Sequence, residues 1–289
     1  MKVKSPKTYD EQVEILRNRG CVITDDVAAV EFLKRTNYYR FSGYLVAFKQ
    51  PDDIYVDDTN FERVASIYTF DQNLRGILTK AVGEIEVFSK SMIAYHHAHK
   101  YGSLGYLNAD NFNKKHNHEL FVEQFGSAIR NNKSTLFVTH HIEKYEGRFP
   151  IWVAAELFTM GMTSLFYADL KTDDKKAIAK EFHTDYVHLE SWLHSTTVLR
   201  NICAHYGRLY NVRYHQNPKL PREYAKFADA NTRSLFKQLY MLKLLYSNFR
   251  DEWNSSIFAP LSALVKKHEK HLDLKTMGFP INWENALSW

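Results

Sequence analysis

The segment from Leu199 to Tyr214, LRNICAHYGRLYNVRY, gathers side chains that can do chemistry on a charged substrate. Arg200 carries a planar, permanently charged guanidinium that suits a phosphate, and His205 can gain or lose a proton near neutral pH. Asn201, four residues before His205, can hold the imidazole or a phosphate oxygen. No nucleophilic thiolate or carboxylate cluster for a metal accompanies them. The set therefore favours metal-independent phosphodiester cleavage, in which the 2′-hydroxyl of RNA attacks phosphorus.

A helix over residues 186–208 would present these groups together. Measured around the helix axis from Arg200, Asn201 lies at about 100° and His205 at about 140°. Arg208 lies at about 80° on the same arc, and apolar residues fill the complementary arc of roughly 160–300°. From the pattern alone, the polar face has two interpretations. It is either a functional site or, as is usual for such faces, a merely solvated surface.

The motif opens a locally basic stretch. Six Lys or Arg residues, Arg213 among them, stand against one acid between Arg200 and Lys226. Basic residues concentrated in this way are typical of a surface that meets phosphates, so Arg213 is a candidate RNA contact.

Three charged residues elsewhere in the chain are also candidates. Glu156 lies in the apolar run PIWVAAELF, where it either orients Arg200 or His205 or faces solvent. Arg40 and Lys49 lie in NYYRFSGYLVAFK, a mixture of aromatic and basic residues that can stack bases and hold phosphates. We assign the tyrosines of this segment to the core, and Arg40 and Lys49 to modest RNA contacts.

Other polar groups have simpler structural interpretations. Asp71 and Arg75 are spaced i,i+4, which predicts a modest surface ion pair. Glu84 and Glu86 are ordinary helix-supporting charges. The histidines of YHHAHKYG, residues 95–102, share no helix face well and have no Cys or carboxylate to complete a site. The sequence therefore predicts no metal and no cofactor.

The spacing of apolar residues predicts an all-α protein. Glycine and proline are scarce, at 11 and 7 residues, and apolar residues recur mostly at helical steps. One long amphipathic helix is predicted from about 61 to 100, after short helices near the start of the chain. Further helices are predicted over residues 118–131, 134–146, 151–169, 173–182, 186–208, 229–249 and 253–271. The apolar, aromatic C-terminal segment should dock on the body. We expect a small N-terminal helical part, 1–52, packed on a larger helical bundle, 53–289.

Composition narrows the class of protein. The 289 residues are 45% hydrophobic, enough for a packed core, and the formal charge of +5 does not by itself imply a nucleic-acid partner. Cys21 and Cys203 are far apart and lack metal-ligand spacing, which argues against a disulfide framework and a structural zinc site. The first residues form no apolar signal core, and no run of eighteen apolar residues occurs. We expect no membrane association and a cytoplasmic location.

Several segments, in this order and spacing, resemble the Abi-like (abortive infection) family of bacterial defence proteins. They are EFLKRTNYYRFSGYLVAFK, IYTFDQNLRGILTKAVGEIEVFSKSMIAY, PIWVAAELFTMGMTSLFYADL and LHSTTVLRNICAHYGRLYN. The resemblance runs from about Asp10 to about Asn211. Within it, RNICAH is similar to the Arg-x(4–6)-His motif of HEPN ribonucleases, in which Asn commonly follows the Arg.

This resemblance implies a fold and an activity. It implies a HEPN-like helical bundle, similar to the nuclease halves of type VI CRISPR effectors, in which two Arg/His sets face one another on RNA. It assigns Arg200, Asn201 and His205 as catalytic, with Arg208 and Asn211 as site support. One chain carries one set, so the site needs a homodimer. Some members are toxins restrained by a companion small RNA.

The expected function is therefore a metal-independent endoribonuclease that acts in abortive infection. The alternative from another class is a non-catalytic helical module that binds RNA or a partner. A third hypothesis is a nuclease that a bound small RNA holds inactive.

Overall fold

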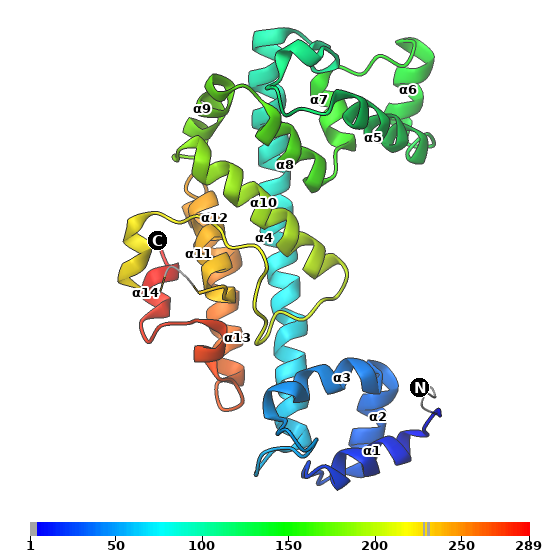
Figure 1. The fold of residues 1–289 in the computed structure, drawn as a ribbon, viewed down its shortest axis with the longest axis vertical. Helices are drawn as coiled ribbons and strands as arrows, with labels where there is room; N and C mark the ends of the chain where they lie inside the picture. The colour runs from blue at the N-terminus through cyan, green and yellow to red at the C-terminus, as the bar shows by residue number, and fades with distance from the viewer. Residues whose placement is uncertain (1–4, 228, 230–231) are drawn as a thin grey trace.

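The computed structural model describes residues 5–227, 229 and 232–289. One helix of 41 residues, α4 (Phe61–Tyr101), runs through the length of the molecule (Figure 1). At 1.5 Å per residue it is about 60 Å long. The Asn60 side chain accepts a hydrogen bond from the Arg63 N–H at its start, and Gly102, at φ 81°, ends it. The predicted long helix is confirmed.

Three short helices pack at the N-terminal end of α4: α1 (Tyr9–Asn18), α2 (Asp26–Thr36) and α3 (Tyr38–Leu45). Thr8 and Glu11 form the predicted capping box at the start of α1. Aromatic rings pack between these helices and α4. The ring centre of Phe41 on α3, for example, lies 4.7 Å from that of Phe61 on α4. This end of the molecule is therefore tied to α4 by apolar packing.

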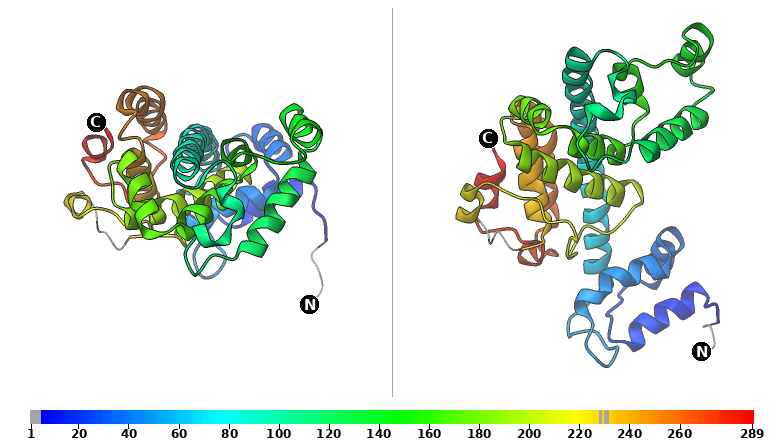
Figure 2. Two further views of the ribbon diagram at one scale, coloured as in Figure 1. Left: turned by 90° about the horizontal axis from the view of Figure 1, so that it is seen from above. Right: turned by 45° about the horizontal axis from the view of Figure 1, so that its top comes forward.

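The opposite end of α4 carries another group of helices (Figure 2). These are α5 (His118–Asn131), α6 (Leu136–Lys144), α7 (Ile151–Ala154) and α8 (Met160–Asp169). The single helix predicted over 151–169 is wrong, because the chain breaks into a 3-10 turn at Ala155–Leu157 and then into extended backbone. Thr159 restarts the helix by accepting a hydrogen bond from the Met162 N–H.

The remaining helices are α9 (Thr172–Glu181), α10 (Tyr186–Ala204), α11 (Leu235–Leu245), α12 (Arg250–Glu252), α13 (Ala259–His268) and α14 (Trp283–Leu287). Of these, α9, α10, α11 and α13 pack along the middle of α4, and α14 packs on α11. The predicted helix 229–249 begins later, after a Ser234 cap, and the one at 253–271 contains a π-helical turn at Trp253–Phe258. Trp283 and Leu287 are buried, so the predicted docking of the C-terminal segment is confirmed.

The all-α class is confirmed: in the described part of the chain the only β-type pairings are isolated bridges. One hydrophobic core runs from α1 to α14. The boundary expected near residue 52 stays a prediction. No helix among the described residues combines the length and apolar character needed to cross a bilayer.

Candidate active site at the end of α10

The helix that carries the motif ends four residues earlier than predicted, at Ala204. The Tyr206 N–H donates to the Cys203 carbonyl at 3.2 Å, and the Gly207 N–H donates to the Ile202 carbonyl at 2.7 Å. This pair of bonds is the Schellman arrangement that closes a helix C-terminus. The chain therefore turns away directly after the motif.

The turn places a non-glycine residue in left-handed backbone: Tyr206 has φ 54°. At Gly207 an added Cβ would lie 3.1 Å from the Ile202 carbonyl oxygen, so a side chain there would require the backbone of Ile202 to shift by a few tenths of an ångström. Arg208 lies beyond the turn, and placing it on the helix face was wrong. Its guanidinium carbon is instead 5.8 Å from the ring centre of Tyr44 on α3.

The three predicted catalytic residues lie at the exposed end of α10. The Arg200 side chain is 42% exposed, and Asn201 and His205 are exposed. Arg200 Nη1 donates to Asn201 Oδ1 at 3.4 Å, and the His205 N–H donates to the Asn201 carbonyl at 3.0 Å. All three are therefore accessible to a ligand within about one helical turn.

Glu86 on α4 is the carboxylate nearest Arg200, a relation that the sequence interpretation missed. Its Oε2 lies 4.0 Å from Arg200 Nε, and its Oε1 lies 2.9 Å from Lys90 Nζ. Glu84, by contrast, accepts a hydrogen bond from the Tyr246 hydroxyl at 2.6 Å, as a structural residue would. No local signal marks this relation, because Glu86 and Arg200 are 114 positions apart and the helical spacing within α4 does not show which helix covers that face.

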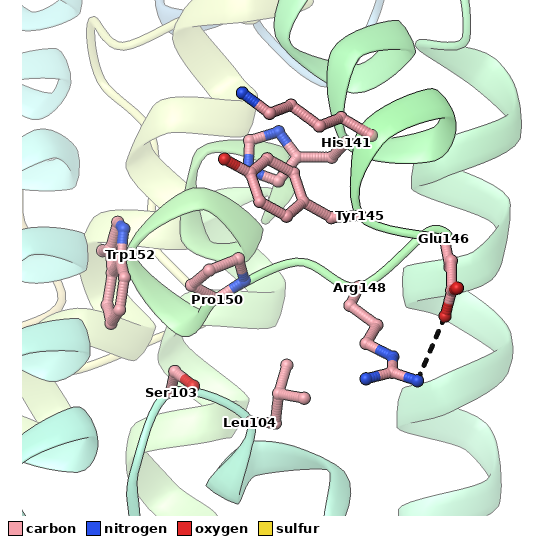
Figure 3. A pocket seen from close by; sticks show the side chains of 9 residues that line it. Ser103, Leu104, His141, Tyr145, Glu146, Arg148, Pro150 and Trp152 are labelled. Atoms are coloured by element: carbon pink, nitrogen blue, oxygen red, sulfur yellow. Dashed lines mark hydrogen bonds and ion pairs between the residues drawn. The ribbon is translucent and has the colours of Figure 1, made fainter.

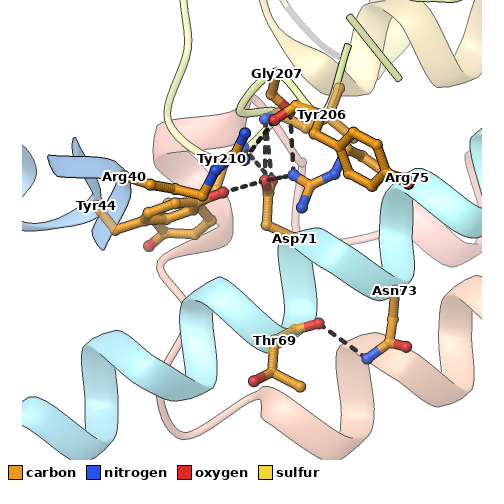
Figure 4. A network of polar contacts seen from close by, with 10 residues as sticks. Arg40, Tyr44, Thr69, Asp71, Asn73, Arg75, Tyr206, Gly207 and Tyr210 are labelled. Atoms are coloured by element: carbon orange, nitrogen blue, oxygen red, sulfur yellow. Dashed lines mark hydrogen bonds and ion pairs between the residues drawn. The ribbon is translucent and has the colours of Figure 1, made fainter. Parts of the chain in front are cut away.

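Beneath the turn lies a buried group that we call the Asp71 cluster: Tyr44, Asp71 and Arg75 (Figure 4). Asp71 accepts hydrogen bonds from the Leu209 N–H at 3.0 Å, the Tyr210 N–H at 2.6 Å and the Tyr44 hydroxyl at 2.6 Å, and it pairs with Arg75. The predicted surface ion pair is wrong, because this face of α4 is covered by α3 and by the chain after α10. Both side chains are at most 5% exposed.

Two arginines hold the carbonyl groups of the turn. Arg75 Nη1 donates to the Gly207 carbonyl at 3.1 Å, and Arg40 Nη1 donates to the Tyr206 carbonyl at 2.7 Å (Figure 4). Arg40 was predicted as an RNA contact, and the structure shows it supporting the motif turn from α3. Arginines suit this position because the carbonyls at a helix C-terminus carry partial negative charge.

Burial governs the acid–base character of these groups. Burial raises the pKa of the Asp71 carboxyl, against the opposing effect of Tyr44, Arg75 and the two N–H donors. Burial, and then the Asp71 carboxylate, raise the pKa of the Tyr44 hydroxyl. The hydroxyl therefore stays protonated and donates a hydrogen bond to Asp71. Burial also raises the pKa of Cys203 to about 12, so no thiolate is available beside the motif.

The other predicted support residues are not gathered at this site. Lys49 pairs with Asp53 in the loop that precedes α4, and Arg213 is exposed. Asn211 is half-buried in left-handed backbone at φ 49°. Glu156 is exposed and has no hydrogen-bond or ion-pair partner among the described residues.

Glu156 instead lines a hollow of about 360 Å³ between α4 and α7, together with Lys90 and Trp152. A larger pocket of about 630 Å³ lies next to it, where Tyr145 and Trp152 line the wall (Figure 3). In this pocket Arg148 is paired with Glu146 at 3.2 Å. No residue of the motif lines either cavity.

The histidines near the end of α4 have a structural setting. His97 is buried among the rings of Tyr101, Phe112 and Phe166, and burial lowers its pKa to about 4. Across residues 5–227, 229 and 232–289, no three His, Cys, Asp or Glu side chains group as the ligands of a metal ion would.

Comparison with known proteins assigns the chain to a family. A model of the Abi-like protein family matches residues 31–211, more than half of the chain, from within α2 through the motif turn. The match starts later than the resemblance at about Asp10 and ends at the same residue. No curated protein and no solved structure matches the chain. The chain therefore belongs to the Abi-like protein family.

Proposed function

We propose that this protein is a metal-independent endoribonuclease of the HEPN type whose site lies at the end of α10. Membership of the Abi-like family supports a role in abortive-infection defence. The observation that carries the proposal is the joint exposure of Arg200, Asn201 and His205 at a helix end fixed from below by the Asp71 cluster. A rigid support beneath exposed polar groups is what a preorganised site requires.

Each residue has a role in the proposed reaction. His205 accepts the proton of the ribose 2′-hydroxyl, whose oxygen attacks the adjacent phosphorus. The bond to the 5′-oxygen breaks as that oxygen takes a proton from water, leaving a 2′,3′-cyclic phosphate and a 5′-hydroxyl. Arg200 stabilises the charge that develops on the phosphate oxygens, and Asn201 holds the imidazole or a phosphate oxygen.

We propose that two copies of the chain form the working enzyme. One chain supplies one Arg/His set, and a two-fold symmetric homodimer brings two sets to one RNA strand. A companion small RNA is proposed as the restraining partner, because the same exposed cations that hold substrate would hold a regulatory strand.

The test is incubation of RNA with the protein in excess EDTA. The wild type and a matched exposed-histidine control, His140→Ala on α6, should cut the RNA under chelation. His205→Ala should lose at least about 100-fold in rate, the contribution expected from general acid–base catalysis. Its melting temperature should match that of the wild type because His205 is exposed.

If RNA binds equally to all three proteins and none cuts it, the protein is a non-catalytic RNA-binding module. Cutting that stops in EDTA would overturn the metal-independent mechanism.

A further inference from the structure

A groove of about 560 Å³ lies along α10, and its lining mixes polar and apolar side chains. The polar part of the lining includes Ser191 and His194 of α10, Ser164 of α8, and Gln216 and Lys219 of the chain that follows the motif. We call it the α10 groove. Neither the motif nor the Asp71 cluster contributes a residue to it.

The rim that carries Lys219 is fixed to α10 by two hydrogen bonds. The Lys219 N–H donates to Ser191 Oγ at 2.9 Å, and Trp192 Nε1–H donates to the Lys219 carbonyl at 2.6 Å. The Lys219 side chain is exposed and has no hydrogen-bond or ion-pair partner in the described part of the chain. These two hydrogen bonds hold the backbone of Lys219 in place, so its positively charged side chain stays at the edge of the groove.

The groove has a surplus of positive charge. Its acid, Glu190, is paired with Lys175, whose Nζ lies 2.8 Å from Glu190 Oε2 and also donates to the Ala168 carbonyl at 3.2 Å. Within the described residues Lys219 has no ion-pair partner, and His194 is exposed and has none either. The groove thus offers an unpaired cation and polar hydrogen-bonding groups to an anionic chain.

The α10 groove lies on the face of the helix that ends at the motif. His194 and Asn201 are seven positions apart, so they lie within about 20° of each other around the axis and about 10 Å apart along it. A strand that leaves Asn201 along this face enters the groove after two helical turns. The pocket of Figure 3 lacks this continuity, and its Arg148 is already paired with Glu146.

We propose that the α10 groove holds the RNA strand on one side of the scissile phosphate, with Lys219 contacting a backbone phosphate. This inference rests on the proposed function. The groove begins about 10 Å along α10 from Asn201, a distance that a few nucleotides of a single strand span. RNAs long enough to reach the groove beyond the cut therefore bind more tightly than RNAs that end before it.

The test measures binding in a chain that cannot cut. Fluorescein-labelled single-stranded oligoribonucleotides are titrated with His205→Ala protein by fluorescence anisotropy, between about 50 and 200 mM salt. Adding Lys219→Ala should reduce the slope of log Kd against log salt by about 0.7, the value for one lost phosphate contact on a single strand. At about 0.1 M salt this corresponds to roughly fivefold weaker binding.

Two further variants complete the design. Lys267→Ala removes an exposed lysine of α13 and should leave the slope unchanged, while Lys219→Arg keeps the charge and should restore it. Together the two variants show whether a reduced salt slope in Lys219→Ala comes from the lost charge. Matched melting temperatures of all variants check independently that the protein is folded.

Equal slopes for the Lys219→Ala and Lys267→Ala proteins would overturn the groove and leave the nuclease proposal standing if the wild type cuts RNA in EDTA. A slope reduced only by Lys219→Ala, in a protein whose wild type never cuts, would keep the groove and overturn the nuclease. Binding that does not change with RNA length would also overturn the groove.

Discussion

Two arginine–carboxylate pairs, one within α4 and one that joins α4 to α10, differ sharply in their surroundings. Arg75 and Asp71 are both at most 5% exposed and are surrounded by further hydrogen bonds. Arg200 and Glu86 are 42% and 18% exposed and are separated by 4.0 Å. The same pair of residue types thus serves two ends: the buried pair fixes the backbone of the turn, and the exposed pair leaves a guanidinium available for a ligand.

Physical magnitudes separate the two pairs. Removing one partner of a buried pair costs about 3–5 kcal/mol, because the other charge stays buried without compensation. An exposed pair contributes about 0–1 kcal/mol, because water and salt screen it. The comparison can therefore be tested by the free energy of unfolding of single variants, which should fall most when the buried pair is changed.

The largest effect is expected for Asp71→Asn. The variant leaves Arg75 buried without its counter-charge and weakens the bonds to Leu209 and Tyr210, so urea unfolding should show a loss of about 3–5 kcal/mol. Asp57→Asn, an exposed change in the loop before α4, should alter the free energy by less than about 0.5 kcal/mol. A loss below about 1 kcal/mol for Asp71→Asn would remove the distinction between the two pairs.

A smaller effect is expected for Tyr44→Phe. It removes one donor to the Asp71 carboxylate, and a hydrogen bond to a charged group contributes about 1.5–3 kcal/mol. Tyr39→Phe, at a side chain that is 87% exposed, is the matched control on α3. A double-mutant cycle with Asp71→Asn should give a non-additive free energy, and strict additivity would show that the hydroxyl acts independently of the carboxylate.

The smallest change in stability is expected for Glu86→Gln, about 1 kcal/mol, because the amide removes the charge from the ion pairs with Arg200 and Lys90 but keeps a hydrogen-bond acceptor for Lys90. Its main effect should be on the ligand, since Arg200 then has no carboxylate partner among the described residues and RNA should bind more tightly to the His205→Ala protein. Glu84→Gln, on the same helix, should leave RNA affinity unchanged. Weaker RNA binding by Glu86→Gln would mean that Glu86 positions Arg200 rather than competes for it.

Apolar spacing was sufficient to predict the helical class, α4 and most of α10, because amphipathic helices report their buried face through a 3.6-residue period. The end of α10 was missed since the left-handed position is filled by Tyr206, where a glycine would have marked the stop. The glycine stands one residue later, at Gly207. Placing Arg208 on the helix followed directly from this error.

The Asp71 cluster could not be predicted from local sequence. An i,i+4 pair looks the same on a covered and on an open helix face, and the partners that bury Asp71 are 138 and 139 positions away in the chain. The break before α8 was hidden for a related reason: this segment is apolar on every side, so its periodicity carries no information about where the helix stops.

The continuity of α4 constrains how the gene can change. Arg75 and Glu86 are parts of one unbroken helix, so inserting or deleting a single codon between them would rotate everything downstream by about 100° and shift it by 1.5 Å. Arg200 would then lose its contact with Glu86, while the turn after α10 kept its contact with Arg75. Substitutions at the exposed positions of this interval, such as Thr79 and Lys80, are tolerable, but changes of length are not.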